Sequence, residues 1–275
     1  MNLVITGSSS GIGRALAERL LARGHLVWGL ARSDQTGLTT SHPGKFHASA
    51  CDVSDWKQIS RVAAEITSAW PHVDGLITCA ACHGAIGRTT RIDPASWSSA
   101  LRTNLDGTFH AIRVFDDSLA RAPRRAKIVC FSGGGATKPR ANFSAYGAAK
   151  AAVVRLVETI ADEERGRALD INAIAPGIVA TRLTDEIVHL GPSIVGDAEF
   201  AAASQAKAAN GPSLEHALGL VEWLLSPDSD GISGKLLSAK WDPWRTLARH
   251  RGELATSDIY TLRRIVPGDR GQAWD

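Results

Sequence analysis

The stretch Leu3-Val4-Ile5-Thr6-Gly7-Ser8-Ser9-Ser10-Gly11-Ile12-Gly13 decides the fold of this chain. It begins as a short buried strand and leads into an amphipathic helical pattern over residues 14–23. Glycines let the backbone come close to a ligand, and a helix N-terminus offers free N–H groups and the positive end of a dipole. A strand, a glycine turn and a helix in this order predict a cradle for a nucleotide pyrophosphate. The residues expected to form it are Gly7, Ser9, Ser10, Gly11, Ile12 and Gly13.

A second stretch, Ser144-Ala145-Tyr146-Gly147-Ala148-Ala149-Lys150, opens a long apolar helical run. Tyr146 and Lys150 are four residues apart, so they share one face of a helix. A phenol with a pKa of roughly 10 is a poor acid or base at neutral pH, but a nearby ammonium stabilises the phenolate. Such a pair can exchange a proton with a substrate oxygen while a hydride moves at carbon. A surface tyrosine beside a solvated lysine has the same spacing, so the rest of the chain must decide.

Composition places the chain among ordinary globular proteins. It has 275 residues, 44% of them hydrophobic and 21% charged, and a formal net charge of +3. This length suits one sheet-based domain, and so small a charge argues against nucleic acid as the main partner. The cluster of Arg121, Arg124, Arg125 and Lys127 is interpreted as a solvated turn ahead of a strand.

The sequence also indicates a cytoplasmic protein that does not enter the membrane. No apolar run approaches the roughly 20 residues that a spanning helix needs. The chain opens directly on the strand pattern Asn2–Ile5, with no signal peptide ahead of it. Four cysteines without a framework spacing fit a reducing cytosol.

Thr-Gly-x-x-x-Gly-x-Gly at residues 6–13, followed by Tyr-x-x-x-Lys at 146–150, resembles the short-chain dehydrogenases/reductases. The resemblance covers at least residues 2–238. It implies an α/β fold, a Rossmann-type doubly wound parallel sheet of about seven strands flanked by helices, in a single domain. It also implies an NAD(P)(H)-dependent oxidoreductase that interconverts a secondary alcohol and a ketone, with the first motif binding the cofactor and the second catalytic.

Hydrophobic patterning locates the remaining elements of this fold. Further strands are expected at residues 26–30, 46–50, 74–77, 127–131, 170–174 and 234–237. Helices are expected over residues 14–23, 55–70, 97–119, 144–160 and 214–225.

The end of the strand 26–30 bears on the choice of cofactor. NAD-preferring enzymes usually carry an acidic residue there, which accepts from the ribose hydroxyls. Here Ala31 is apolar and Arg32 follows, and arginine suits a 2′-phosphate through charge-assisted bonds. We therefore predict NADP(H) in preference to NAD(H). The alternative is that Arg32 is a strand-end arginine that faces water.

The resemblance implies further cofactor contacts at two strand ends. The family places Asp-Val against the adenine, so Asp52 and Val53 are expected there, while Asp55 or Ser54 can cap the next helix. Thr78-Cys79-Ala80-Ala81 stands where the family usually has Asn-Asn-Ala-Gly. Cys79 and Ala80 are still expected beside the cofactor. Cys79 and Cys82 spell Cys-x-x-Cys, but no second pair exists to complete a zinc site, so no metal is predicted.

Asn172-Ala173-Ile174-Ala175-Pro176-Gly177-Ile178-Val179-Ala180-Thr181 resembles the family's Asn-x-x-x-Pro-Gly-x-x-x-Thr segment. The resemblance implies that the backbone after Pro176, with Gly177, and the hydroxyl of Thr181 hold the nicotinamide carboxamide. These contacts would set which face of the ring meets the substrate.

Two more catalytic residues follow from the resemblance. Asn104 matches the helix asparagine that holds a water leading from the catalytic lysine to solvent. The catalytic serine usually lies 13 residues before the tyrosine, whereas Ser132 lies 14 before it and position 133 is glycine. A flexible glycine run would let Ser132 reach the substrate carbonyl oxygen and stabilise charge there. Ser144 is a less favoured substitute.

The rest of the chain is less specific. Residues 182–212, polar and interrupted by glycines, are expected to form a mobile substrate lid. Residues 239–275 extend beyond the catalytic domain 1–238 and hold three of the eight tryptophans and several arginines, so they are expected to pack on their own subunit or on a neighbour. The tail resembles that of short-chain enzymes from bacterial biosynthetic gene clusters.

The family packs the Asn104 and Lys150 helices against partner subunits, which implies a homodimer or homotetramer acting on a small-molecule substrate. Two alternatives remain open at this point. A non-catalytic regulatory or scaffold protein would keep the glycine turn without the catalytic set. A sugar-nucleotide-modifying enzyme usually has another glycine spacing and a larger C-terminal substrate domain.

Overall fold

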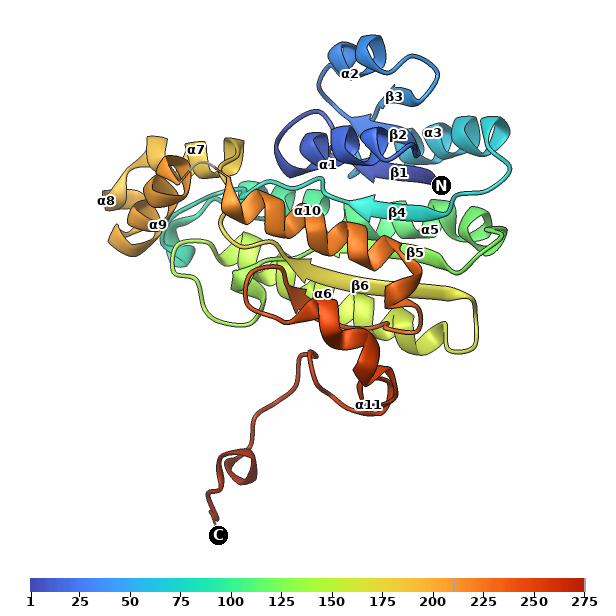
Figure 1. Cartoon of the computed structure of the whole chain (residues 1–275). Helices are drawn as coiled ribbons and strands as arrows, with labels where there is room; N and C mark the ends of the chain where they lie inside the picture. Colours follow the sequence, from blue (N-terminus) through green and yellow to red (C-terminus); the bar gives the residue numbers. More distant parts are fainter. Residues whose placement is uncertain (210, 275) are drawn as a thin grey trace.

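The computed structural model describes residues 1–209 and 211–274. Asn210 in the expected lid and Asp275 at the end of the tail lie outside the described residues. Within them, seven parallel strands form one sheet in the order β3-β2-β1-β4-β5-β6-β7 (Figure 1). The strands are β1 (Asn2–Thr6), β2 (Leu26–Ala31), β3 (Phe46–Ala50), β4 (Gly75–Thr78), β5 (Ala126–Phe131), β6 (Leu169–Ala175) and β7 (Leu236–Ser238). The predicted doubly wound Rossmann-type sheet is confirmed.

The helices cover both faces of this sheet. They are α1 (Gly11–Ala22), α2 (Thr36–Ser41), α3 (Trp56–Ala69), α4 (Pro94–Leu101), α5 (Gly107–Ala120), α6 (Ser144–Glu163), α7 (Arg182–Leu190), α8 (Pro192–Val195), α9 (Asp197–Ala208), α10 (Pro212–Leu225) and α11 (Arg251–Thr256). Short 3₁₀ turns lie at Thr89–Arg91, Gly134–Ala136, Pro227–Ser229, Trp244–His250 and Pro267–Arg270. None of the described helices is both long and apolar enough to cross a membrane.

The central strands β1, β4, β5 and β6 are mostly apolar and almost completely buried, because helices cover the sheet on both faces. Leu3 and Ile5 point to the face covered by α1 and α10, while Val4 between them points to the face of α3, α5 and α6. Strand order reverses between β1 and β4, so the connections that leave the carboxyl ends of these two strands lead toward opposite edges of the sheet. In doubly wound sheets such a point opens the crevice in which ligands bind.

The helix expected over residues 97–119 is broken in its middle. A turn of π-helix, Arg102–Asp106, separates α4 from α5. The Asn104 amide nitrogen donates to Ala100 O and to Cys82 O, both at 2.8 Å. Such π turns often mark functional sites. Sequence periodicity did not predict this π turn, because Asn104 bonds to Cys82, which lies in the loop after β4 and not in the helix.

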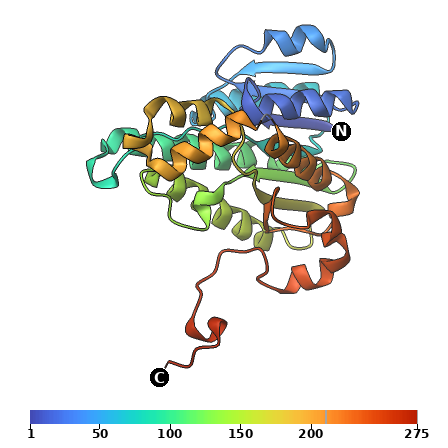
Figure 2. The same cartoon turned by 60° about the vertical axis from the view of Figure 1, so that its left-hand side comes forward.

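The residues that follow β7 pack mostly on their own subunit. The buried indole of Trp244 lies 6.0 Å from that of Trp223, and Leu247 and Leu254 join the same apolar cluster. Farther on, Leu236 N donates to Tyr260 O at 2.8 Å. The last part of the tail projects away from the body of the protein (Figure 2).

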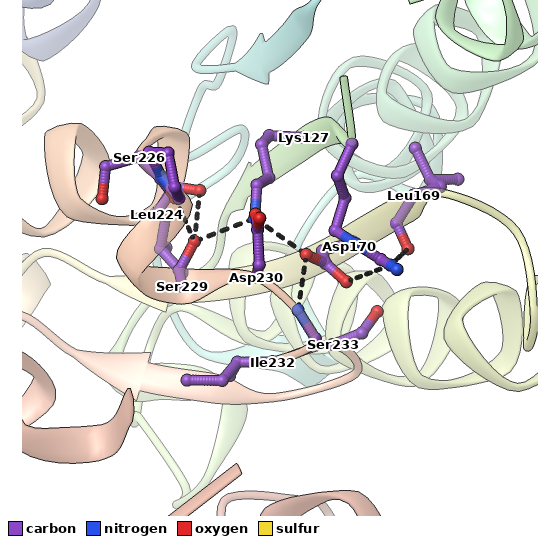
Figure 3. A network of polar contacts seen from close by, with 12 residues as sticks. Lys127, Leu169, Asp170, Leu224, Ser226, Ser229, Asp230, Ile232 and Ser233 are labelled. Atoms are coloured by element: carbon purple, nitrogen blue, oxygen red, sulfur yellow. Dashed lines mark hydrogen bonds and ion pairs between the residues drawn. The ribbon is translucent and has the colours of Figure 1, made fainter. Parts of the chain in front are cut away.

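A buried polar network ties the amino-terminal ends of β5 and β6 to the turn before β7 (Figure 3). Lys127 Nζ lies 2.8 Å from Asp170 Oδ2, 2.7 Å from Asp230 Oδ1 and 3.1 Å from Ser229 Oγ. Asp170 also accepts from Gly231 N at 3.0 Å. Lys127 is only 3% exposed, so its assignment to a solvated basic turn is wrong. Its partners come from remote segments that the local charge pattern does not reveal.

Replacing Asp170 with Asn should lower the free energy of unfolding by about 2–4 kcal/mol, because the Lys127 ammonium stays buried with less compensating charge. Urea denaturation measures this. Asp162→Asn is the matched control, since its pair with Arg165 is about 70% exposed on both sides and should contribute less than about 1 kcal/mol. Equal losses in the two variants would contradict the assignment of a stabilising buried pair.

Candidate active site

A cavity of about 1070 Å³ lies at the carboxyl ends of the strands, beside the β1–β4 reversal. A volume of this size accepts a ligand larger than most single small molecules. Asn104, among the residues predicted from the sequence, does not line it. The predicted residues that line it are Gly7, Ser9, Ser10, Gly11, Ile12, Gly13, Arg32, Asp52, Val53, Cys79, Ala80, Ser132, Tyr146, Lys150, Pro176, Gly177 and Thr181.

The backbone of the glycine turn requires that positions 7 and 13 carry no side chain. Gly7 has φ +73°, and a Cβ there would lie 2.7 Å from Ala80 N. A Cβ on Gly13 would lie 2.4 Å from Gly7 O. The turn therefore packs backbone against backbone and brings the N-terminus of α1 to the cavity wall. This cradle fits a dinucleotide pyrophosphate, held by backbone N–H groups and the helix dipole.

Arg32 and Asp52 meet at the rim beyond this turn. Arg32 Nη1 lies 3.8 Å from Asp52 Oδ2, and the arginine side chain is 61% exposed. Asp52 Oδ1 accepts from the backbone N and the hydroxyl of Ser54, while Asp55 caps α3 by accepting from Lys57 N. The long, exposed ion pair leaves the guanidinium open to an anionic group at this end of the cavity.

Tyr146 and Lys150 lie on the cavity side of α6. Lys150 is buried, and its Nζ donates to Phe131 O at 2.7 Å and lies 5.6 Å from the centre of the Tyr146 ring. Burial lowers the pKa of Lys150 to about 8. Burial raises the pKa of Tyr146 above its usual value, and the charge of Arg140 opposes that shift. The phenol is therefore protonated at neutral pH and can donate to an oxygen in the cavity.

The two serine hydroxyls near Tyr146 form hydrogen bonds within the protein. Ser132 Oγ donates to Lys150 O at 3.0 Å, and Ser144 Oγ accepts from Trp97 Nε1 at 3.1 Å. Gly133, two residues after β5, lies beside the phenol, since a Cβ there would lie 3.2 Å from Tyr146 Oη. The role expected for Ser132 toward a substrate oxygen stays a prediction, and its bond to Lys150 O stands against it.

Asn104 lies behind the cavity and holds the loop after β4. Besides its bonds to Cys82 O and Ala100 O, its Oδ1 accepts from Cys82 N at 3.3 Å. The side chain is completely buried. The part that Asn104 was expected to play in proton transfer stays a prediction, whereas the contacts themselves fix the backbone at Cys82.

The Cys79-x-x-Cys82 pair lies in this loop as two free thiols. Burial raises the pKa of Cys79, so its thiol stays protonated. Among residues 1–209 and 211–274, no three His, Cys, Asp or Glu side chains gather closely enough to hold a metal ion.

Known proteins agree with this geometry. The family model described as short chain dehydrogenase matches residues 1–189. The protein belongs to the short-chain dehydrogenase family. It is 30% identical over 191 residues to the short-chain reductase protein NovJ of Streptomyces niveus. The aligned region covers 68% of this chain and 72% of NovJ. It is 28% identical to the 3-oxoacyl-[acyl-carrier-protein] reductase FabG of Haemophilus influenzae, over 66% of this chain and 75% of FabG.

Two solved structures superpose on most of this short-chain dehydrogenase. Thermoplasma acidophilum aldohexose dehydrogenase AldT has a TM-score of 0.74 at 25% identity, covering 86% of this chain and 91% of AldT. The Saccharomyces cerevisiae short-chain dehydrogenase/reductase YIR035C has a TM-score of 0.80 at 24% identity, covering 89% and 98% of the two chains. Members of the family bind a nicotinamide cofactor and act on small molecules as oxidoreductases.

The part of this short-chain dehydrogenase expected as a mobile polar lid is mostly helical. Helices α7, α8 and α9 pack together around their own apolar cluster of Phe143, Ile187, Val195 and Ala203. Phe143 comes from the segment just before α6, so the cluster joins α7, α8 and α9 to the start of α6.

Two pairs of polar side chains around Tyr146 were missed from the sequence. Arg140 donates through Nε and Nη2 to both carboxylate oxygens of Glu199, at 2.9 and 2.7 Å. His83 Nδ1 lies 3.0 Å from Glu186 Oε2, and the His83 ring meets the Tyr146 ring edge-on with 5.2 Å between centroids. Each pair joins residues at least 59 apart in the chain, so no local pattern could have identified it.

Gly13→Ala should disrupt the cradle, because its Cβ cannot fit 2.4 Å from Gly7 O. We expect at least a tenfold loss of NADPH affinity, followed by fluorescence transfer from tryptophan to nicotinamide, and a loss of about 1–3 kcal/mol in stability. Gly252→Ala is the control, since a Cβ there meets nothing within 4 Å. Unchanged binding in the Gly13 variant would show that the turn does not cradle the cofactor.

Proposed function

We propose that this short-chain dehydrogenase is an NADP(H)-dependent oxidoreductase that interconverts a secondary alcohol and a ketone. The observation that carries the proposal is that Tyr146 and Lys150 line the same cavity as the glycine turn. A proton donor beside a dinucleotide cradle is what carbonyl reduction requires.

Each residue has a defined task in this reaction. The nicotinamide nucleotide, when bound, supplies or accepts the hydride. Tyr146 donates a proton to the carbonyl oxygen in reduction and removes it from the alcohol in oxidation. The Lys150 ammonium stabilises the phenolate that forms during the transfer and binds the ribose. Pro176, Gly177 and Thr181 border the cavity where they would orient the nicotinamide.

The preference for NADP(H) rests on the rim at Arg32. Its guanidinium is exposed and only loosely paired, and the preceding residue, Ala31, offers no carboxylate to ribose hydroxyls. An added 2′-phosphate would give this guanidinium a stronger partner than Asp52 provides.

Arg32→Ala should reduce NADPH affinity by about tenfold or more and leave NADH affinity nearly unchanged, since one charge-assisted hydrogen bond contributes about 1.5–3 kcal/mol. Fluorescence transfer during titration with each nucleotide measures both affinities. Arg61→Ala, an exposed arginine of α3 that does not line the cavity, is the control. If the unaltered protein binds NADH as tightly as NADPH, or more tightly, Arg32 does not confer a preference for NADP(H).

Tyr146→Phe should lower kcat for ketone reduction by about 10²–10⁴-fold, because the proton donor is lost while the ring remains. NADPH binding should stay within about twofold, which separates chemistry from binding. The readout is NADPH oxidation at 340 nm with a panel of ketones. If the unaltered protein binds NADPH but reduces no ketone in a broad panel, the result would favour the alternative of a non-catalytic regulatory or scaffold protein.

The assembly and the cellular setting stay proposals as well. Exposed Phe109 on α5 and Trp56 on α3 leave apolar surface on the face where a homodimer or homotetramer would form. All four cysteines are free thiols, which suits a cytoplasmic protein. A place in a bacterial biosynthetic pathway stays a prediction.

A further inference from the structure

The polar groups next to Tyr146 decide what else a substrate can offer. A ketone oxygen bound by the Tyr146 phenol leaves the neighbouring carbons facing the side chains around that phenol. Arg140 lies over the ring, with its Cζ 5.6 Å from the ring centroid, but its Nε and Nη2 are taken by Glu199. Lys150 is engaged with Phe131 O. The Lys150 ammonium and the Arg140 guanidinium carry only hydrogen-bond donors, so neither can accept a hydrogen bond from a substrate hydroxyl.

The segment just after β5 offers no acceptor to the substrate beside the phenol. Gly133 has no side chain, and a Cβ there would lie 3.2 Å from Tyr146 Oη. The hydroxyl of Ser132 is directed to Lys150 O.

His83 is the remaining polar group against the phenol ring. Its side chain is 4% exposed, it lines the cavity, and its ring also packs edge-on against Phe143. Asn104 fixes the preceding residue, Cys82, by bonds to both its N–H and its carbonyl. The imidazole is therefore held in place from both its backbone and its ring.

Glu186 determines the hydrogen-bonding character of this imidazole. A carboxylate 3.0 Å from Nδ1 requires the proton on that nitrogen. In the neutral ring Nε2 is then a hydrogen-bond acceptor, and it has no partner within residues 1–209 and 211–274. His83 Nε2 and Tyr146 Oη together offer one acceptor and one donor.

Burial keeps the His83 imidazole neutral at neutral pH. Burial, the largest effect, and Arg140 lower the pKa of His83, while Glu186 and Glu199 oppose them in part. The net pKa lies below the usual value for histidine, so the neutral ring persists.

We propose that His83, oriented by Glu186, accepts a hydrogen bond from a hydroxyl group next to the substrate ketone. The substrate class is therefore a hydroxyketone, and the product is the corresponding diol. This inference rests on the proposed oxidoreductase function and specifies its substrate. A plain ketone would leave the Nε2 acceptor buried without a partner, which costs binding free energy.

The test compares 3-hydroxy-2-butanone with 3-methoxy-2-butanone and 2-butanone, and 2-hydroxycyclohexanone with 2-methoxycyclohexanone and cyclohexanone. The methoxy ketones keep the oxygen but cannot donate. With NADPH, kcat/KM for each hydroxyketone should exceed that for its partners by about tenfold to a hundredfold. His83→Phe should erase this preference, and His83→Gln, which keeps an acceptor, should restore part of it. Equal preference in the unaltered protein and in His83→Phe would overturn the proposal.

Glu186→Gln should weaken the preference, because an amide no longer requires the proton on Nδ1 of His83. His189→Ala and Asp185→Asn are the matched controls, exposed on the same helix α7 as Glu186. Neither control should alter the hydroxyketone preference. A similar change in the controls would indicate a general effect of the lid helices rather than recognition by His83.

A measurement without turnover separates this proposal from the function on which it rests. Nitrogen-15 NMR of the histidine rings in the NADPH complex at pH 7 reports which nitrogen of His83 carries the proton. We expect a neutral ring protonated at Nδ1, with this tautomer lost or mixed in Glu186→Gln. A proton on Nε2 at pH 7 would overturn the proposal even if ketones are reduced. NADPH binding with no reduction of any probe would instead contradict the proposed function.

Discussion

Two hydrogen bonds between the end of β5 and α6 hold the reactive part of this protein together. The buried Lys150 ammonium donates to Phe131 O at 2.7 Å, and Ser132 Oγ donates to Lys150 O at 3.0 Å. Both bonds lie in a water-poor interior, where an unpaired polar group is costly. They fix α6 against the sheet, and Tyr146, one turn before Lys150, lines the cavity.

The glycine turn and the surroundings of Tyr146 differ in how closely they follow the family pattern. At the cofactor end, Gly7 and Gly13 allow backbone contacts that no side chain could replace. Around Tyr146, the Ser132 hydroxyl donates to Lys150 O, and Gly133 places no Cβ beside the phenol. The polarity beside the phenol therefore comes from other elements.

Those elements lie far apart in the chain. Glu186 on α7 reaches His83 after β4, and Glu199 on α9 binds Arg140 before α6. Glu199 neutralises the Arg140 guanidinium, whose charge would otherwise be costly to bury near the phenol. Glu186 orients the His83 imidazole. Helices α7 and α9 thus contribute to the electrostatics around Tyr146.

The sequence by itself determined the elements whose signals are local. The apolar runs of β1 to β7, the glycine turn and the Tyr146–Lys150 spacing depend on near neighbours, so the fold and the family could be predicted. Only the tertiary structure decided that Lys127 is buried against Asp170, that a π turn interrupts the helix at Asn104, and that His83 meets Tyr146. Each of these depends on a partner more than 20 residues away, and burial of a polar group is settled by that partner rather than by the residues beside it.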